Sequence, residues 1–225
     1  MSWHAHLALN YRFEAERTLV HSLHSGPLRV LASLYPEGPA VCHNVLVHPP
    51  GGIVGGDVLE LELTLGAQAH ALITTPGAAR FYRSAGTPAT QSVRARVDAG
   101  ARLEWLPLQT ICQRGALAQS SLRFELQPGA EMIGWDVLAL GLPASDAAFD
   151  SGRYEQRIEL PGVWLERGVI DGQDTRLLDS PLGWAGQRVM GTMWLAAGSK
   201  LAAARRDVLL EAAREVATSH SLRAT

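Results

Sequence analysis

Histidine and cysteine are the residues of this sequence whose side chains could bind a transition metal, because imidazole and thiolate suit nickel, copper and zinc. The chain has eight histidines and two cysteines. His4 and His6 would share one face of a strand, but two ligands do not close a site. Cys42 and His43 are adjacent, so in a strand they point to opposite faces. We therefore expect no tightly bound metal, although a weak, transient site lined by carboxylates or imidazoles needs fewer fixed ligands.

Sequence motifs of the common enzyme classes are missing. The glycine-rich segment HPPGGIVGGD, residues 48–57, is not followed by the Gly-Lys-Ser/Thr of a phosphate-binding loop or by a helical pattern. GxGxxG and GxSxG are also missing, so a hydrolase would have to assemble its serine, histidine and aspartate from distant segments. The sequence therefore predicts no catalytic residues, no cofactor and no enzyme activity.

Length, composition and charge narrow the class of protein further. The chain has 225 residues, of which 47% are hydrophobic, so one domain with a sizeable core is expected. A formal charge of -2 disfavours binding to nucleic acid or to an anionic membrane. No apolar run reaches the roughly 18 residues of a membrane-spanning helix, and the start lacks a secretory signal. Together with only two cysteines, Cys42 and Cys112, which we expect to be reduced, this indicates a cytoplasmic protein.

Three copies of one pattern predict the fold: an alternating strand, a Gly-Ala turn and a more apolar strand. The copies begin at Val58, Ser92 and Ser121, about 30 residues apart. Alternation leaves one face of each first strand wet, which is typical of antiparallel sheets and not of parallel sheets covered by helices. We therefore expect each copy to be a hairpin, with a further hairpin over residues 154–169. The spacing suits both a sandwich and a solenoid.

The composition changes after Gly198, where SKLAAARRDVLLEAAREVA predicts a helix with Ser199 as N-cap. Its apolar stripe is modest, so the expectation is that it packs on the sheets, and a partner-binding helix is the alternative. The predicted fold class is mainly β: layered antiparallel sheets, sandwich-like or solenoid-like, with a C-terminal helix.

Two Pro-Gly-rich loops carry the candidate residues for binding a partner. In TTPGAARFYRS, residues 74–84, Tyr82 and Arg83 have the side chains that concentrate in protein interfaces. A core position with a salt bridge is the alternative for this pair. His48 precedes two prolines and is expected to orient the turn, with a role in binding as a further candidate.

These segments together resemble a known family. GPLRVLASLYPEG, HPPGGIVGGD, TTPGAARFYRS and LEWLPLQTI occur in the order found in the urease accessory protein family UreD, also called UreH. The resemblance runs from about Trp3 to Gly191 and includes WDVLALGLPA and FDSGRY. It implies a noncatalytic scaffold or chaperone that docks on apo-urease with UreF and the GTPase UreG and assists nickel insertion. The alternative is a β-rich metal-binding or hydrolytic protein that acts alone.

The sequence departs from the family pattern in several places. We expect a single UreD-like domain over residues 1–225 that lacks the usual C-terminal segment of the family. LPLQTI lacks a carboxylate that relatives carry beside Gln109, and the segment Leu140–Pro143 lacks an arginine. Arg80 replaces a lysine of many relatives, which keeps the charge and changes the geometry of its donors.

If nickel passes through the chain, oxygen-rich side chains are the expected stations. Borderline ions move through relays of carboxylates, carbonyls and water more readily than through thiolate cages. Four acids flanked by apolar residues are the candidates: Asp57, Glu104, Asp136 and Glu166. The competing interpretation of each is a turn-capping or salt-bridged acid with Arg83 or Arg167 as partner.

Overall fold

The computed structural model of the chain describes residues 2–219, most of which lie in β-strands. The elements in chain order are β1 (His4–Glu14), β2 (Arg17–Ser25), β3 (Arg29–Leu34), β4 (Val41–Val47), β5 (Val58–Leu65), β6 (His70–Thr74), β7 (Ala79–Phe81), β8 (Ala89–Val97), β9 (Arg102–Trp105), β10 (Thr110–Cys112), β11 (Leu117–Leu126), β12 (Glu131–Leu140), the 3-10 helix η1 (Pro143–Ser145), β13 (Arg153–Leu160), β14 (Trp164–Asp171), α1 (Thr175–Asp179), β15 (Val189–Ala197) and α2 (Ala203–Ser219).

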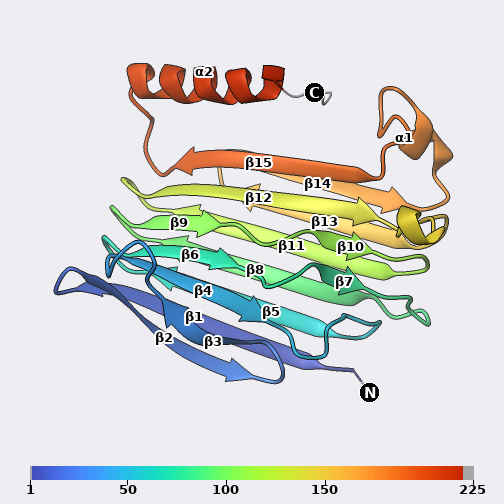
Figure 1. Cartoon of the computed structure of the whole chain (residues 1–225), viewed down its shortest axis with the longest axis horizontal. Coiled ribbons are helices and arrows are strands. Elements are labelled where there is room, and N and C mark those ends of the chain that lie inside the picture. The colour runs from blue at the N-terminus through green and yellow to red at the C-terminus, as the bar shows by residue number, and fades with distance from the viewer. Residues whose placement is uncertain (1, 220–225) are drawn as a thin grey trace.

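The strands form two sheets that lie face to face (Figure 1). Sheet A has the order β14-β13-β11-β8-β5-β1-β2. Sheet B runs β3-β4-β6-β9-β12, continues through β10 and β7, and has β15 on the other side of β12. Successive repeats add one strand to each sheet, so the chain winds as a stacked solenoid from the N-terminal to the C-terminal end of the molecule.

The Gly-Ala turns carry the chain from one sheet to the other. Ala69, Ala101 and Ala130 occupy equivalent turn positions and are completely buried. Neighbouring turns are linked by backbone hydrogen bonds, for example from Arg102 N to the Ala69 carbonyl (2.9 Å) and from Glu131 N to the Ala101 carbonyl (3.1 Å). The small alanine side chain allows this close stacking of one coil on the next.

The predicted mainly-β class, the layering, the solenoid alternative and the C-terminal helix are confirmed. The antiparallel arrangement predicted for the repeats was wrong. β5, β8, β11 and β13 pair parallel to one another, and so do β4, β6, β9 and β12. Alternation of polar and apolar residues was taken as a sign of antiparallel strands. Here it arises in parallel sheets, because each sheet is covered by the other sheet on one face only and its outer face is exposed to solvent.

Antiparallel pairs occur at the two ends of the stack. β1 pairs with β2 and β3 with β4 at one end, while β13 pairs with β14 and β12 with β15 at the other. The hairpin predicted over residues 154–169 is therefore confirmed as part of β13 and β14.

The hydrophobic core fills the space between the sheets. Every second residue of the long strands points inward, as the alternating pattern predicts. The largest side chains that are fully buried are Tyr154, Phe81, Phe124, Leu7, Leu9, Leu63, Leu65, Ile73, Leu103, Leu122, Leu138 and Leu140. Cys42 and Cys112 are buried free thiols, as expected.

Helix α2 lies at the C-terminal end of the stack, beyond β15 (Figure 1). Over residues 203–218 only Leu209 is partly buried, so the expected packing on the sheets was wrong. Ser199 lies before the helix, and its hydroxyl accepts a hydrogen bond from Gly129 N (3.1 Å) instead of capping the first turn. Within residues 2–219, no helix is both long enough and apolar enough to cross a membrane.

Candidate functional site

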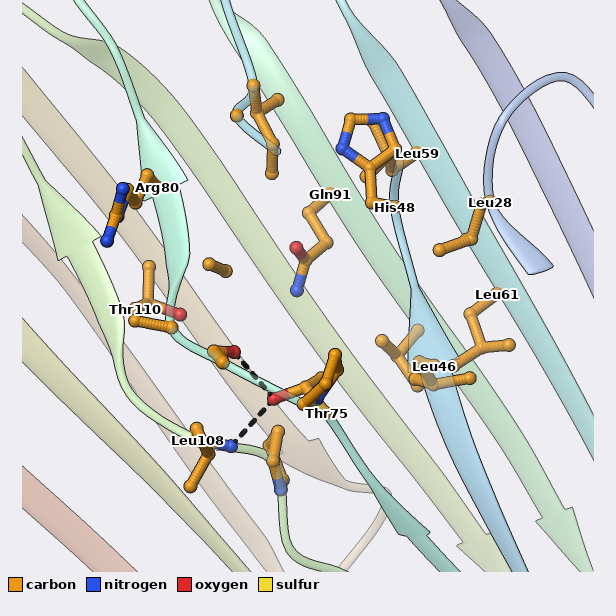
Figure 2. A pocket seen from close by; sticks show the side chains of 18 of the residues that line it. Leu28, Leu46, His48, Leu59, Leu61, Thr75, Arg80, Gln91, Leu108 and Thr110 are labelled. Atoms are coloured by element: carbon orange, nitrogen blue, oxygen red, sulfur yellow. Dashed lines mark hydrogen bonds between the residues drawn. The ribbon is translucent and has the colours of Figure 1, made fainter. Parts of the chain in front are cut away.

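An opening in sheet B leads into the space between the sheets. Residues 75–78 separate β6 from β7, and residues 106–109 separate β9 from β10. The Thr75 hydroxyl holds these two segments together, since it accepts a hydrogen bond from Leu108 N (2.9 Å) and donates one to the Gly77 carbonyl (3.0 Å) (Figure 2). The segment 48–53 forms another wall, where Ile53 pairs with Phe81.

A cavity of about 280 Å³ lies inside this opening. Most of its lining is apolar, and leucines such as Leu28, Leu46, Leu59 and Leu61 come from three different segments, the last two from β5. Figure 2 shows Gln91 reaching into the cavity from β8. The cavity therefore has an apolar wall with a polar group at its floor.

Gln91 begins a polar row across the inner face of sheet A. The strand register places Gln91 beside Ser120 of β11, and Ser120 beside Gln156 of β13. Ser120 and Gln156 are buried. In the same row, the neighbouring positions on β5 and β1 are Leu59 and Ala5, so the row is apolar at the N-terminal end and polar towards the C-terminal end.

Asp136 of β12 faces this row from the other sheet. Its side chain is 9% exposed, and its Oδ2 accepts a hydrogen bond of 2.5 Å from Gln156 Nε2. The pKa of Asp136 is raised to about 6, mainly by burial and in part by the charge of Glu166, while the Gln156 hydrogen bond acts in the opposite direction. The carboxyl group can therefore gain or lose its proton close to neutral pH.

Two further titratable groups in the interior between the sheets, Cys112 and Tyr154, remain protonated. Burial raises the pKa of Cys112 to about 12, so this thiol does not supply a thiolate ligand. Burial also raises the pKa of Tyr154 well above its ordinary value, and the Asp136 carboxylate adds to that shift. Oxygen atoms are thus the ligands that this region offers.

Glu166 lies at the outer end of the polar region, on the edge strand β14. It is opposite the buried Ile158 in the strand register, so it belongs to the inward face of the sheet. It is partly exposed. The adjacent inward position is Gly168, which pairs with Gln156 and leaves space at the end of the row. Asp136, Gln156 and Glu166 thus connect the interior with the C-terminal edge of the stack.

The other two predicted carboxylates lie elsewhere. Asp57 is 1% exposed and accepts hydrogen bonds from Trp3 N (2.7 Å) and Val54 N (2.9 Å), so it fixes the glycine-rich loop. Glu104 points to the outer face of sheet B, where its Oε1 lies 2.8 Å from His70 Nε2. Of the four candidates, the structure brings only Asp136 and Glu166 together.

Of the three candidates for partner binding, only His48 is among the residues that line the cavity. Burial lowers the pKa of His48, while the nearby Asp57 acts in the opposite direction. Tyr82 is partly buried against Gly52, where any side chain larger than hydrogen would meet its ring. Arg83 is exposed beside Gly115.

Sequence reasoning missed the neutral members of the polar row. Gln91, Ser120 and Gln156 occupy positions that are in phase with the apolar residues of their alternating strands. A polar residue in phase with a buried stripe is the signal that could have identified them.

The described part of the chain contains no group of three histidine, cysteine, aspartate or glutamate side chains that could hold a metal ion. The polar region offers two carboxylates with amide and hydroxyl groups around them. Such an arrangement can bind a divalent cation briefly and release it, because it lacks the closed ligand set of a structural site.

Comparison with known proteins adds a family match. The family model of the UreD urease accessory protein matches residues 4–225. The chain is 61% identical to the urease accessory protein UreD of Leptothrix cholodnii over 227 residues, which cover all of this chain and 82% of that protein. It is 59% identical to the protein of the same name from Albidiferax ferrireducens and 60% identical to that of Polaromonas naphthalenivorans, with the same coverage.

Proposed function

The chain belongs to the UreD family of urease accessory proteins, and on this premise we propose that it is a noncatalytic scaffold for urease maturation. In this proposal it docks on apo-urease together with UreF and the GTPase UreG in the cytoplasm and assists the insertion of nickel. The family match across residues 4–225 is the observation that carries the proposal. The absence of enzyme motifs from the sequence is consistent with a noncatalytic role.

The proposed route of nickel runs between the two sheets. It begins at the cavity lined by His48 and Gln91, follows Ser120 and Gln156 past Asp136, and ends at Glu166 on the β14 edge. The support is the continuity of this polar row inside an otherwise apolar core. Asp57 and Glu104 are left out of the route, because one fixes a loop and the other pairs with His70 on the outer face.

The chemistry of the row suits an ion in transit. A carboxylate with one amide donor beside it attracts a cation without enclosing it, and the second carboxylate offers the next position. The raised pKa of Asp136 means that a proton competes with the cation near neutral pH. Nickel would displace the proton from the Asp136 carboxyl group when it binds, and the carboxylate would take up a proton again when nickel leaves.

Docking is assigned to the loops that carry Tyr82, Arg83 and His48, which are the contact candidates. The ring of Tyr82 packs against Gly52, and Arg83 is exposed beside Gly115. Aromatic and arginine side chains carry much of the binding energy in protein interfaces.

The test is complementation of urease-producing cells that lack this chain. Those cells should make inactive, nickel-poor urease, and restoring the full chain should recover both activity and nickel content. UreF, UreG and apo-urease should co-purify with the tagged chain. Full urease maturation without the chain would overturn the proposal, and turnover of a small molecule by the isolated chain would favour the stand-alone alternative.

A further inference from the structure

Within residues 2–219, four strands besides the three-residue β7 pair with only one other strand: β2, β3, β14 and β15. Three of these four carry features that discourage pairing with another chain. β2 carries Arg17 and two histidines, and β14 carries Glu166, Arg167 and Asp171. β3 has an irregular register between Val30 and Ser33. Charges and bulges on edge strands are the usual protection against edge-to-edge association.

β15 has none of these protections. Its nine residues, VMGTMWLAA, include no charge and no proline, and its register with β12 is regular from Val189 to Ala197. Within residues 2–219, no strand pairs with its other edge. A long, uncharged and regular free edge is a site for adding a strand.

The hydrogen bonds show which groups of β15 are free. Leu140 N donates to the Arg188 carbonyl (2.8 Å), and Gly198 N donates to the Ala130 carbonyl (2.9 Å). Because both pairs belong to one antiparallel register, the even-numbered residues between them direct their backbone groups to β12. The odd-numbered residues direct theirs to the free edge; they are Val189, Gly191, Met193, Leu195 and Ala197.

From this geometry we propose that the free edge of β15 is a self-association site, at which β15 of a second copy pairs antiparallel about a twofold axis at Met193. This goes beyond the proposed function. A register centred on Met193 places odd-numbered residues opposite odd-numbered residues, so all outward backbone groups find partners. It also places Leu195 beside the partner's Gly191, so a large side chain meets a position without one.

The outward side chains suit this occupant. Met193 is 66% exposed and Leu195 is 43% exposed on the outer face of sheet B, and pairing would cover both. β15 has no charged residues, so pairing of two copies brings no like charges opposite each other. A strand from a different protein would gain the same backbone hydrogen bonds but not this symmetric match of large and small side chains.

Helix α2 is the element that must move. It lies beyond β15 in Figure 1, and an ion pair between Arg205 and Glu131 ties it to β12. Over residues 203–218 its side chains are exposed apart from the partly buried Leu209, so this ion pair is a main attachment of the helix to the sheets. Breaking this ion pair with Arg205→Ala should therefore strengthen self-association.

Sedimentation of the full chain over a wide concentration range tests the proposal. The wild-type chain should show a monomer–dimer equilibrium. Met193→Pro removes an outward N–H that β12 does not use, and it should raise the dimer dissociation constant more than about tenfold. Met193→Ala keeps that N–H and is the matched control, with a much smaller change. A wild-type chain that stays monomeric at every concentration, or a Met193→Pro chain that dimerises as well as Met193→Ala, would overturn the proposal.

Cysteine cross-linking tests the register independently of stability. A cysteine at Met193 would face its own copy across the axis, within the range of a disulfide, whereas a cysteine at Val189 would face Ala197 of the second copy. Oxidation should therefore cross-link Met193→Cys and not Val189→Cys. Cys42 and Cys112 are buried, so the native cysteines should contribute little background cross-linking. Equal cross-linking at both positions would contradict the twofold register, and cross-linking to a different protein alone would replace the second copy as occupant.

Discussion

The two ends of the solenoid interior differ in chemistry although they share one architecture. At the N-terminal end, the inward positions of β1 and β5 are apolar, from Ala5 and Leu7 to Leu59 and Leu61. At the C-terminal end, the equivalent positions of the next strands include Ser120 and Gln156, with Asp136 facing them. Burying a polar side chain costs free energy that an apolar side chain at the same position would not cost, so the polar row calls for another explanation, which we take to be passage of a cation.

The largest effect should come from the apolar end. Leu63→Ala removes a side chain that is 2% exposed and leaves a cavity, which should lower the free energy of unfolding by about 2–5 kcal/mol. Ser120→Ala at the polar end should change it by less than about 1 kcal/mol. Urea denaturation of both variants measures the difference. If both variants lost the same free energy of unfolding, the polar row would contribute to stability as much as the apolar end does, and the two ends would not differ in this respect.

Replacement of Asp136 by asparagine should stabilise the protein in a pH-dependent way. Because the pKa of Asp136 is raised from 3.8 to about 6 in the folded state, its ionisation opposes folding. That cost is absent below about pH 4, grows as the pH rises towards 6 and is constant above it. A shift of two pH units corresponds to about 3 kcal/mol, so Asp136→Asn should be more stable than wild type by up to about this amount at pH 8 and equal to it at pH 4. Urea denaturation at several pH values between 4 and 8 measures the free energy of unfolding of both proteins. A constant difference between them over this range would contradict the account.

A smaller effect should follow from removing the neighbouring charge. Glu166→Gln takes away a negative charge that raises the pKa of Asp136, so the Asp136 titration should move to lower pH. Carbon-13 NMR of the aspartate carboxyl groups measures this shift. Glu104→Gln is the matched control on the outer face and should leave Asp136 unchanged. An equal response to both substitutions would show that Glu166 is not the specific neighbour.

The strands themselves could be predicted from the sequence, but their partners could not. Leu59, Leu61, Leu63 and Leu65 alternate with polar residues, and this period identifies β5 and its buried face. The same period of two is compatible with a hairpin and with a coil of a solenoid. It shows which face of the strand is exposed to solvent, but it does not show with which strand it pairs. The turn at Ala69 decides between them, since it sends the chain to the other sheet.

The candidate site was partly predictable for the same reason. An acid among apolar residues indicates at least partial burial, which holds for all four candidates: Asp57 and Asp136 are buried, and Glu104 and Glu166 are partly buried. Whether two acids meet depends on the register of strands in different sheets. Asp136 and Glu166 are 30 positions apart on β12 and β14, and only the packing of sheet B on sheet A places them near each other. The hydrogen bond from Gln156 depends on the same packing.

Nickel content of urease matured by variant chains tests the central claim most directly. Asp136→Ala and Glu104→Ala each remove one carboxylate, the first from the polar row and the second from the outer face. Both variants should still co-purify with the accessory proteins and apo-urease. The account predicts nickel-poor urease with Asp136→Ala and normal nickel content with Glu104→Ala. Equal, normal nickel content in both preparations would contradict the claim that the cation passes between the sheets.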